Sequence, residues 1–174
     1  NIWDYVDMPS VVDWVLLQEF ARNGDAYSSS MHIYRNGGGL IHFVPWDFDI
    51  GMGGGCGDPD GWNNRWSGHW LNSIAGDPVF QAAFVARYTE LRKTVLSDEA
   101  IAAQLDGYVT TMTPEAITQN FERWPIDQII GGDDWVLIFR EGCPVETWDE
   151  EHELMQAWIT ARLAWMDDNI QDFG

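Results

Sequence analysis

The feature that most constrains the fold of this chain is a series of helix-start signals. Each signal combines a side chain that can cap a helix with proline or acidic residues in the first helical turn. They stand at Asp7–Ser10, Asp77-Pro78, Ser97–Glu99, Thr113–Glu115 and Thr147–Glu150, the last being a capping box. We therefore expect five helices, which end near residues 22, 96, 111, 124 and 170.

One segment favours β-structure instead. Met31–Tyr34 and Leu40–Val44 are short runs rich in apolar residues, and Asn36–Gly39 between them is a turn sequence. Pro45 ends the second run, because proline has no N–H to donate to a strand ladder. The remaining sequence predicts a long ordered loop over 51–69 and irregular structure over 126–146 with a short strand at Trp135–Phe139. The expected fold class is α+β and mainly α, as a single domain with one hairpin.

Two aspartates, Asp25 and Asp47, flank the hairpin. Because an antiparallel hairpin brings its outer ends together, we expect them to lie close to each other with Ser30 between them, and Gly24 can supply a positive φ in the preceding turn. Phosphoryl transfer needs one carboxylate to accept a proton and another to hold Mg²⁺. The order Asp25-x-x-x-x-Ser30, hairpin, Asp47-Phe-Asp follows the protein-kinase layout. Spacing alone also fits aspartates that merely form turns.

Charge narrows the class of partner. The chain of 174 residues carries 28 acidic and 9 basic residues, a net charge of −19. A polyanion needs a basic footprint, so nucleic acid and anionic membranes are excluded as partners. No apolar run reaches the roughly 18 residues that span a bilayer.

The ends and cysteines bear on where the protein works. The chain starts at Asn1 without Met, so we expect a mature or excised piece whose targeting signal is not included. Cys56 and Cys143 could form one disulfide if the chain is secreted. The oligomeric state is left open.

At the level of whole segments, the chain resembles the C-terminal portion of the CotH (spore-coat protein H) kinase domain, a group of atypical protein kinases. The helix and turn at 11–27 resemble the family's Asn-x-Asp-x-Tyr catalytic turn. Residues 28–53 resemble its hairpin and Trp-Asp-Phe/Tyr-Asp/Asn metal motif. Further similar segments follow in order at 77–97, 120–124 and 146–170. The resemblance implies a protein-kinase-like C-lobe.

The resemblance also implies a reaction. The protein would transfer the γ-phosphoryl group of ATP to Ser or Thr of a secreted or cell-surface protein substrate. Asp25 would be the catalytic base. Asn23 would fix the rotamer of that base, or would simply cap the preceding helix.

A metal site is implied as well. Asp47 would hold Mg²⁺ or Mn²⁺ and, through the metal, the phosphates of ATP. Ser30 and Asp49 would assist as further metal ligands. Trp46 and Phe48 are expected to be core anchors that set the direction of Asp47.

The part of a kinase that clamps the nucleotide is not apparent in this sequence. A glycine-rich loop and a lysine paired with a glutamate are needed, whereas the one lysine, Lys93, falls in a predicted helix. Gly51–Gly55 follows the metal motif, and Gly37–Gly39 is a hairpin turn. We expect the clamp upstream of Asn1 and little or no kinase activity from this chain alone. The rival interpretation is a non-catalytic binding or scaffold module, a pseudokinase, on the cell surface.

Three weaker interpretations involve other chemistry. Asp58–Gly61 resembles the start of a calcium loop but lacks the later ligands, so a simple turn is favoured. Trp62, Trp66 and Trp70 could form a sugar-stacking surface, although their spacing more often marks a buried helix face. A hydrolase using Asp25 and Asp47 as paired carboxylates would depend on their separation.

Overall fold

Each of the five helix-start signals begins a helix in the computed structural model, which describes residues 1–52, 57–63, 70–125 and 147–173. In every case the expected side chain accepts the capping hydrogen bond, and Thr147 and Glu150 form the predicted capping box. The second helix ends at Arg92, earlier than expected, and the short helix at Trp70–Ala75 was not predicted.

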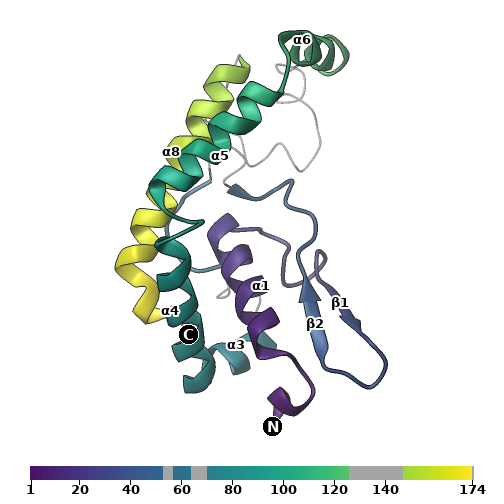
Figure 1. Ribbon diagram of the computed structural model, residues 1–174, viewed down its shortest axis with the longest axis vertical. Coiled ribbons are helices and arrows are strands. Elements are labelled where there is room, and N and C mark those ends of the chain that lie inside the picture. Colours follow the sequence, from purple (N-terminus) through teal and green to yellow (C-terminus); the bar gives the residue numbers. More distant parts are fainter. Residues whose placement is uncertain (53–56, 64–69, 126–146, 174) are drawn as a thin grey trace.

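The described part of the chain is mainly helical with one small sheet (Figure 1). Its elements are η1 (Ile2–Asp4), α1 (Met8–Ala21), β1 (His32–Arg35), β2 (Ile41–Val44), α3 (Trp70–Ala75), α4 (Pro78–Arg92), α5 (Asp98–Thr111), α6 (Pro114–Arg123), α8 (Trp148–Asn169) and η4 (Ile170–Asp172). The α+β, mainly α expectation is confirmed.

The predicted hairpin forms beside α1 (Figure 1). β1 and β2 pair antiparallel, with Ile33 opposite Phe43, and Phe43 turns toward α1, where its ring lies 5.2 Å from that of Trp14. The segment before α1 also bonds to β2, because the amide of Asp7 donates to the carbonyl of Ile41 at 2.9 Å. The hairpin is therefore anchored to both the start and the side of α1.

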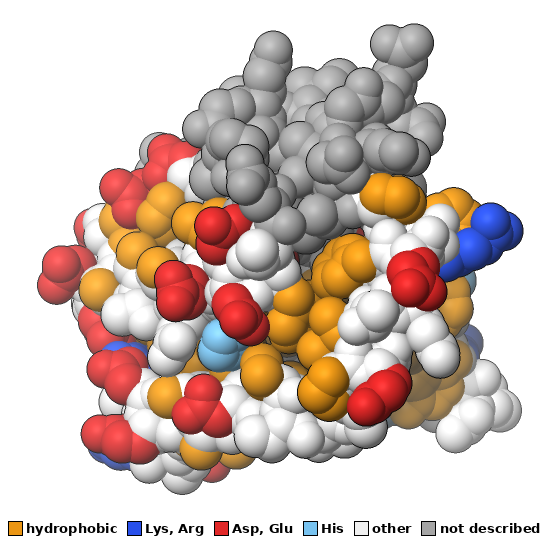
Figure 2. Space-filling model, turned by 90° about the horizontal axis from the view of Figure 1, so that it is seen from above, with side chains coloured by type: hydrophobic (Ala, Val, Ile, Leu, Met, Phe, Trp, Pro, Cys, Tyr) orange, Lys and Arg blue, Asp and Glu red, His pale blue; other side chains and the backbone are white. Residues whose placement is uncertain are grey.

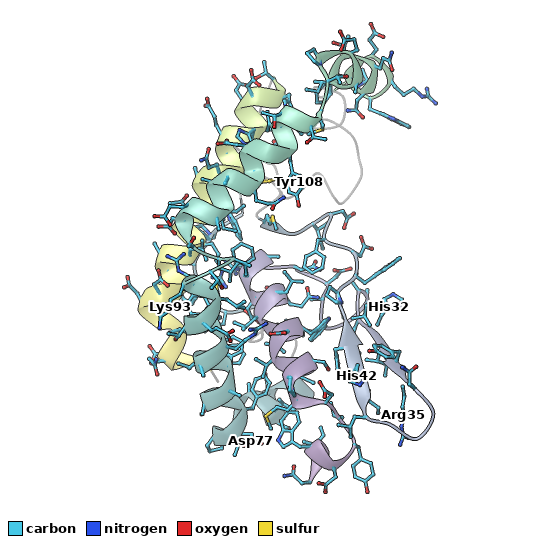
Figure 3. The ribbon with its side chains drawn as sticks, viewed as in Figure 1. His32, Arg35, His42, Asp77, Lys93 and Tyr108 are labelled. Carbon is cyan, nitrogen blue, oxygen red and sulfur yellow. The ribbon has the colours of Figure 1, made fainter. Side chains whose placement is uncertain are left out.

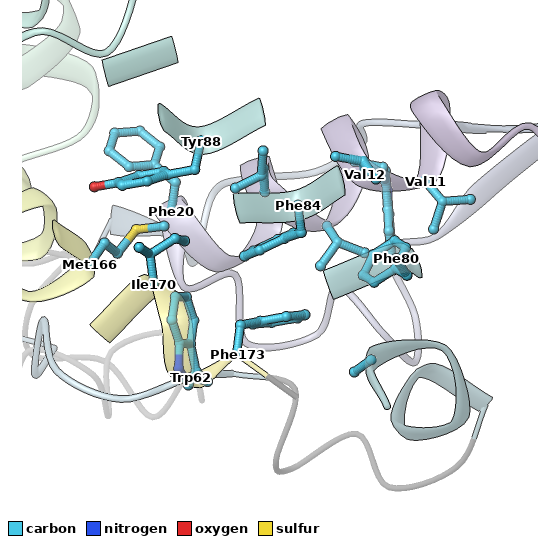
Figure 4. Packing of buried hydrophobic residues seen from close by; sticks show 14 of the residues in the cluster. Val11, Val12, Phe20, Trp62, Phe80, Phe84, Tyr88, Met166, Ile170 and Phe173 are labelled. Atoms are coloured by element: carbon cyan, nitrogen blue, oxygen red, sulfur yellow. The ribbon is translucent and has the colours of Figure 1, made fainter. Parts of the chain in front are cut away.

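The core lies between α1, α4 and the C-terminal end of the chain (Figure 4). Phe84 of α4 stacks on Phe173 with their ring centroids 4.0 Å apart, and Trp62 packs edge-on against both rings. Nine of the 14 residues of α1 are buried, so this helix is enclosed on most sides. Its C-terminal end, which leads into the turn that carries Asp25, is thus held by the core.

An ion-pair cluster joins α4 to α8 and predicts how stability depends on pH. Arg92 donates to both carboxylate oxygens of Asp167, at 2.8 and 2.9 Å, and the Tyr88 hydroxyl donates to it at 2.8 Å. Burial acts to raise the pKa of Asp167, but the hydrogen bonds from Arg92 and Tyr88 outweigh it, so the pKa is lowered. A carboxyl whose pKa is lower in the folded state stabilises the fold at pH values above its unfolded-state pKa. That stabilisation is lost as the pH falls through the folded-state pKa.

Asp167→Asn should therefore lower the free energy of unfolding at neutral pH by about 0.5–1 kcal/mol, a figure already reduced for the partial exposure of this carboxyl. The difference from the parent should shrink once the pH drops below about 3.9, the unfolded value. Urea denaturation at both pH values measures it. The neighbouring exposed Asp168 supplies the control variant, Asp168→Asn, and an equal loss in both variants would contradict the assignment.

Candidate functional site

The turn that carries Asp25 begins where α1 ends. Arg22, the C-cap residue, adopts a left-handed conformation with φ of 46°. The positive φ expected at Gly24 is thus found two residues earlier, because Arg22 closes the helix with its amide directed at the carbonyls of Gln18 and Glu19. The amide of Asn23 also donates to the Gln18 carbonyl, at 3.2 Å.

Asp25 organises the turn that follows. Its main-chain carbonyl accepts hydrogen bonds from the amides of Ser28, Ser29 and Ser30. The Ser30 hydroxyl, nearly inaccessible to solvent, donates to Oδ2 of Asp25 at 2.6 Å. The other carboxylate oxygen, Oδ1, is buried and has no hydrogen-bond partner among the described residues. Asp25 therefore has one oxygen fixed by Ser30 and one that is buried without a described hydrogen-bond partner.

Asp47 lies at the other end of the hairpin, just after β2. It is exposed and adopts a left-handed conformation with φ of 56°, which is uncommon for a residue other than glycine. Its carbonyl accepts a hydrogen bond of 2.7 Å from the side-chain amide of the fully buried Asn23. Asn23 thus ties the turn of Asp25 to the main chain of Asp47, a contact with the second acid instead of the first.

The pKa of Asp47 is raised by neighbouring acids. Repulsion by Asp49 is the largest influence that raises the pKa of Asp47, followed by desolvation, a side-chain hydrogen bond with Asp49 and the charge of Asp25. Repulsion between neighbouring carboxylates makes it more favourable for one of them to take up a proton or for the group to bind a cation. The charges of Asp49 and, more weakly, Asp25 therefore both act on Asp47, and the joint site of Asp25 and Asp47 stays a prediction.

The expectation that Trp46 is a core anchor is wrong. The side chain of Trp46 is 57% exposed and contacts the ring of His32 edge-on at 4.9 Å. Trp46 lies two residues beyond the end of β2, after Pro45. Phe48 is half-buried, and its carbonyl accepts a hydrogen bond from the Gly51 amide at 3.0 Å.

Two residues close to the site were missed by the sequence reasoning. Glu19 and Arg162 are both fully buried, and the Arg162 guanidinium lies 4.0 Å from the Glu19 carboxylate. Burial of Arg162 could have been predicted from its place in the sequence of α8. It lies on the apolar face of the helix, between Ile159 and Leu163.

Lys93, the candidate calcium loop and Trp62 do not contribute to this site. The side chain of Lys93 is exposed at the end of α4, away from the hairpin (Figure 3). In the candidate calcium loop, Arg22 and Arg162 donate to the carbonyls of Asp58, Pro59, Asp60 and Gly61, so those oxygens already have partners. Trp62 belongs to the core instead of a sugar-stacking surface. Cys56, Cys143, Trp66 and the predicted strand at 135–139 fall outside the described residues.

The described surface is strongly acidic. Figure 2 shows acidic side chains distributed over one face with few basic ones, in keeping with the net charge of −19. No described group of three or more His, Cys, Asp or Glu side chains is arranged to hold a metal by itself. None of the described helices has the length and apolar character needed to cross a bilayer.

Comparison with known proteins gives one match. No curated protein and no solved structure is significantly similar to this chain. The family described as CotH kinase protein matches residues 1–166, a range that contains the whole hairpin and both flanking acids. The chain therefore belongs to the CotH kinase family.

Proposed function

We propose that this chain is the catalytic and metal-binding part of a CotH-type protein kinase. In this proposal the full-length protein transfers the γ-phosphoryl group of ATP to a Ser or Thr hydroxyl of a secreted or cell-surface protein. The observation that carries the proposal is that Asp25 and Asp47 flank the antiparallel hairpin and that Asn23, two residues before Asp25, bonds to the main chain of Asp47. The two carboxyls have different surroundings, one partly buried and held by Ser30, the other exposed beside Asp49.

Asp25 fits the role of general base. Its Oδ1 atom is buried without a described partner, while Ser30 holds Oδ2. An acceptor hydroxyl that bonds to the Asp25 carboxylate would transfer its proton to Asp25 as its oxygen bonds to the γ-phosphorus. The bond from that phosphorus to the bridging oxygen breaks, and ADP leaves with the bonding electrons.

Asp47 fits the role of the main metal ligand. Asp49 adds a second carboxylate. The Ser30 oxygen, while its hydroxyl donates a hydrogen bond to Asp25, still has lone pairs that could bind a metal. Mg²⁺ is commonly bound by one or two carboxylates with substrate phosphates and water. A complete set of protein ligands is thus not required. Bound Mg²⁺ or Mn²⁺ would neutralise the phosphate charge, which an acidic surface otherwise repels.

Binding of Mn²⁺–ATP to the full-length protein tests this assignment. Asp47→Asn keeps the size of the side chain but removes the charge, and should weaken binding by at least about tenfold. Isothermal titration calorimetry measures the affinity. Asp106→Asn, at an exposed position on α5, is the control and should bind like the parent. Unchanged affinity in Asp47→Asn would refute the metal site.

The position of Lys93 supports one rival function. Because the one lysine of the sequence lies away from the hairpin, the chain does not supply the phosphate-binding lysine of a kinase at this site. A pseudokinase scaffold would bind Mn²⁺–ATP through Asp47 without transferring phosphate. Incubation with γ-labelled ATP and candidate Ser/Thr proteins separates the two, since only the enzyme gives labelled protein.

A further inference from the structure

A buried arginine on α8 holds together the segments that surround the site. The guanidinium of Arg162 is inaccessible to solvent and donates to three main-chain carbonyls. Glu19 accepts at 2.7 and 3.1 Å, Pro59 at 2.6 Å and Gly61 at 2.8 Å. Arg162 therefore fixes the last turn of α1 relative to the 57–63 loop.

The Glu19 side chain continues this network toward the site. Its Oε1 atom accepts a hydrogen bond from the hydroxyl of Tyr27, two residues after Asp25, at 2.5 Å. Its Oε2 atom accepts one from the main-chain amide of Asn63 at 2.6 Å. One buried carboxylate thus bridges the turn of Asp25 and the end of the loop.

Asn63 makes the next link. Its side-chain amide donates to the carbonyl of Asn23 at 2.6 Å, and the side chain of Asn23 donates to the carbonyl of Asp47 at 2.7 Å. Asn63 and Asn23 are 8% and 0% exposed, so water competes little for these bonds. The hydrogen bonds form a continuous path from Glu19 to the main chain of Asp47.

We propose that Asn63 is a positioning residue for Asp47, acting through Asn23, an inference that rests on the proposed metal-binding role of Asp47. Asp47 occupies an uncommon left-handed conformation, and the direction of its carboxylate depends on that conformation. The Asn23 bond holds the carbonyl of Asp47, and Asn63 holds the main chain of Asn23. Groups that orient metal ligands in this way typically change metal affinity when they are removed.

The test measures Mn²⁺ affinity of the full-length protein by electron paramagnetic resonance. Asn63→Ala removes the amide that holds Asn23 and should weaken Mn²⁺ binding by about 10-fold. Gln81→Ala is the matched control, because it also removes one side-chain amide bonded to a main-chain carbonyl, that of Phe173. The control should bind Mn²⁺ like the parent, whatever its thermal stability.

A second comparison separates positioning from loss of stability. In a background that already carries Asp47→Asn, Asn63→Ala should have no further effect on Mn²⁺ affinity, because the ligand that it positions has lost its charge. If Asn63→Ala does not fold, the nearly isosteric Asn63→Asp, which has no amide to donate, takes its place. If the folded Asn63 variant binds Mn²⁺ like the parent, and Asp47→Asn alone loses binding, the positioning role of Asn63 is refuted. Parent-like affinity in Asp47→Asn refutes the metal site itself.

Discussion

Replacing Asp25 with asparagine in the full-length protein is expected to slow phosphoryl transfer by about 10²–10⁴-fold. Asparagine has nearly the same shape and can still accept the hydrogen bond that Ser30 donates to Oδ2 in the parent. It is not basic enough to take a proton from an attacking hydroxyl. The loss should appear in kcat, whereas the affinity for Mn²⁺–ATP should stay close to that of the parent.

Single-turnover transfer from γ-labelled ATP measures the chemical step, and titration calorimetry measures nucleotide binding. Asp106→Asn is the control, because it makes the same change at an exposed position on α5. The parental rate is expected there. If Asp25→Asn transferred phosphate at the parental rate, Asp25 would not be the base, even if Asp47→Asn still abolished metal binding.

The parts of the fold that follow local rules were predictable. Asp7, Asp77, Ser97, Thr113 and Thr147 each cap the helix that they were expected to start, because a capping bond involves only residues two or three positions apart. The hairpin was equally local, since its turn and strand residues are contiguous. Asp25 and Asp47 flank this hairpin, as the spacing predicted, whereas their joint role in a site stays a prediction.

The support of the site depends on long-range packing and was not predictable. Arg162 reaches the Glu19 carbonyl across 143 positions, and Asn63 reaches that of Asn23 across 40. No local pattern pairs such distant residues. Burial of Trp46 was predicted wrongly for a related reason. Trp46 lies beyond the end of β2, after Pro45, where no periodic pattern indicates whether a side chain faces the core.

Arg162→Met should lower the free energy of unfolding by about 3–5 kcal/mol, because it breaks a buried ion pair by removing one partner. Methionine fills most of the same volume, so little of the loss comes from a cavity. Glu19 would keep the bonds from Tyr27 and Asn63 but would lose the buried guanidinium that lies 4.0 Å from its carboxylate. The carbonyls of Pro59 and Gly61 would lose the same donor.

Urea denaturation at neutral pH, with Arg87→Met as the control, measures this loss. Arg87 also bonds a carboxylate, that of Asp13, but both side chains are partly exposed, so its replacement should cost no more than about 1 kcal/mol. Equal losses in the two variants would show that burial does not set the cost. In the double variant Arg162→Met/Glu19→Gln, part of the loss should be recovered, since a neutral amide is easier to bury than a carboxylate that has lost the charge of Arg162.

The pKa of Arg162 indicates that burying the Arg162–Glu19 pair has a free-energy cost. Burial lowers that pKa to about 10 even though the charge of Glu19 acts to raise it, so keeping the cation in the core has a cost. At neutral pH the guanidinium is still charged and still donates to the Glu19 carbonyl and the 57–63 loop. An apolar side chain could fill the space but could not orient these carbonyls. Arg162 therefore holds the last turn of α1 and the 57–63 loop in place. The hydrogen bonds from Asn63 to Asn23 and from Asn23 to Asp47 start from these segments.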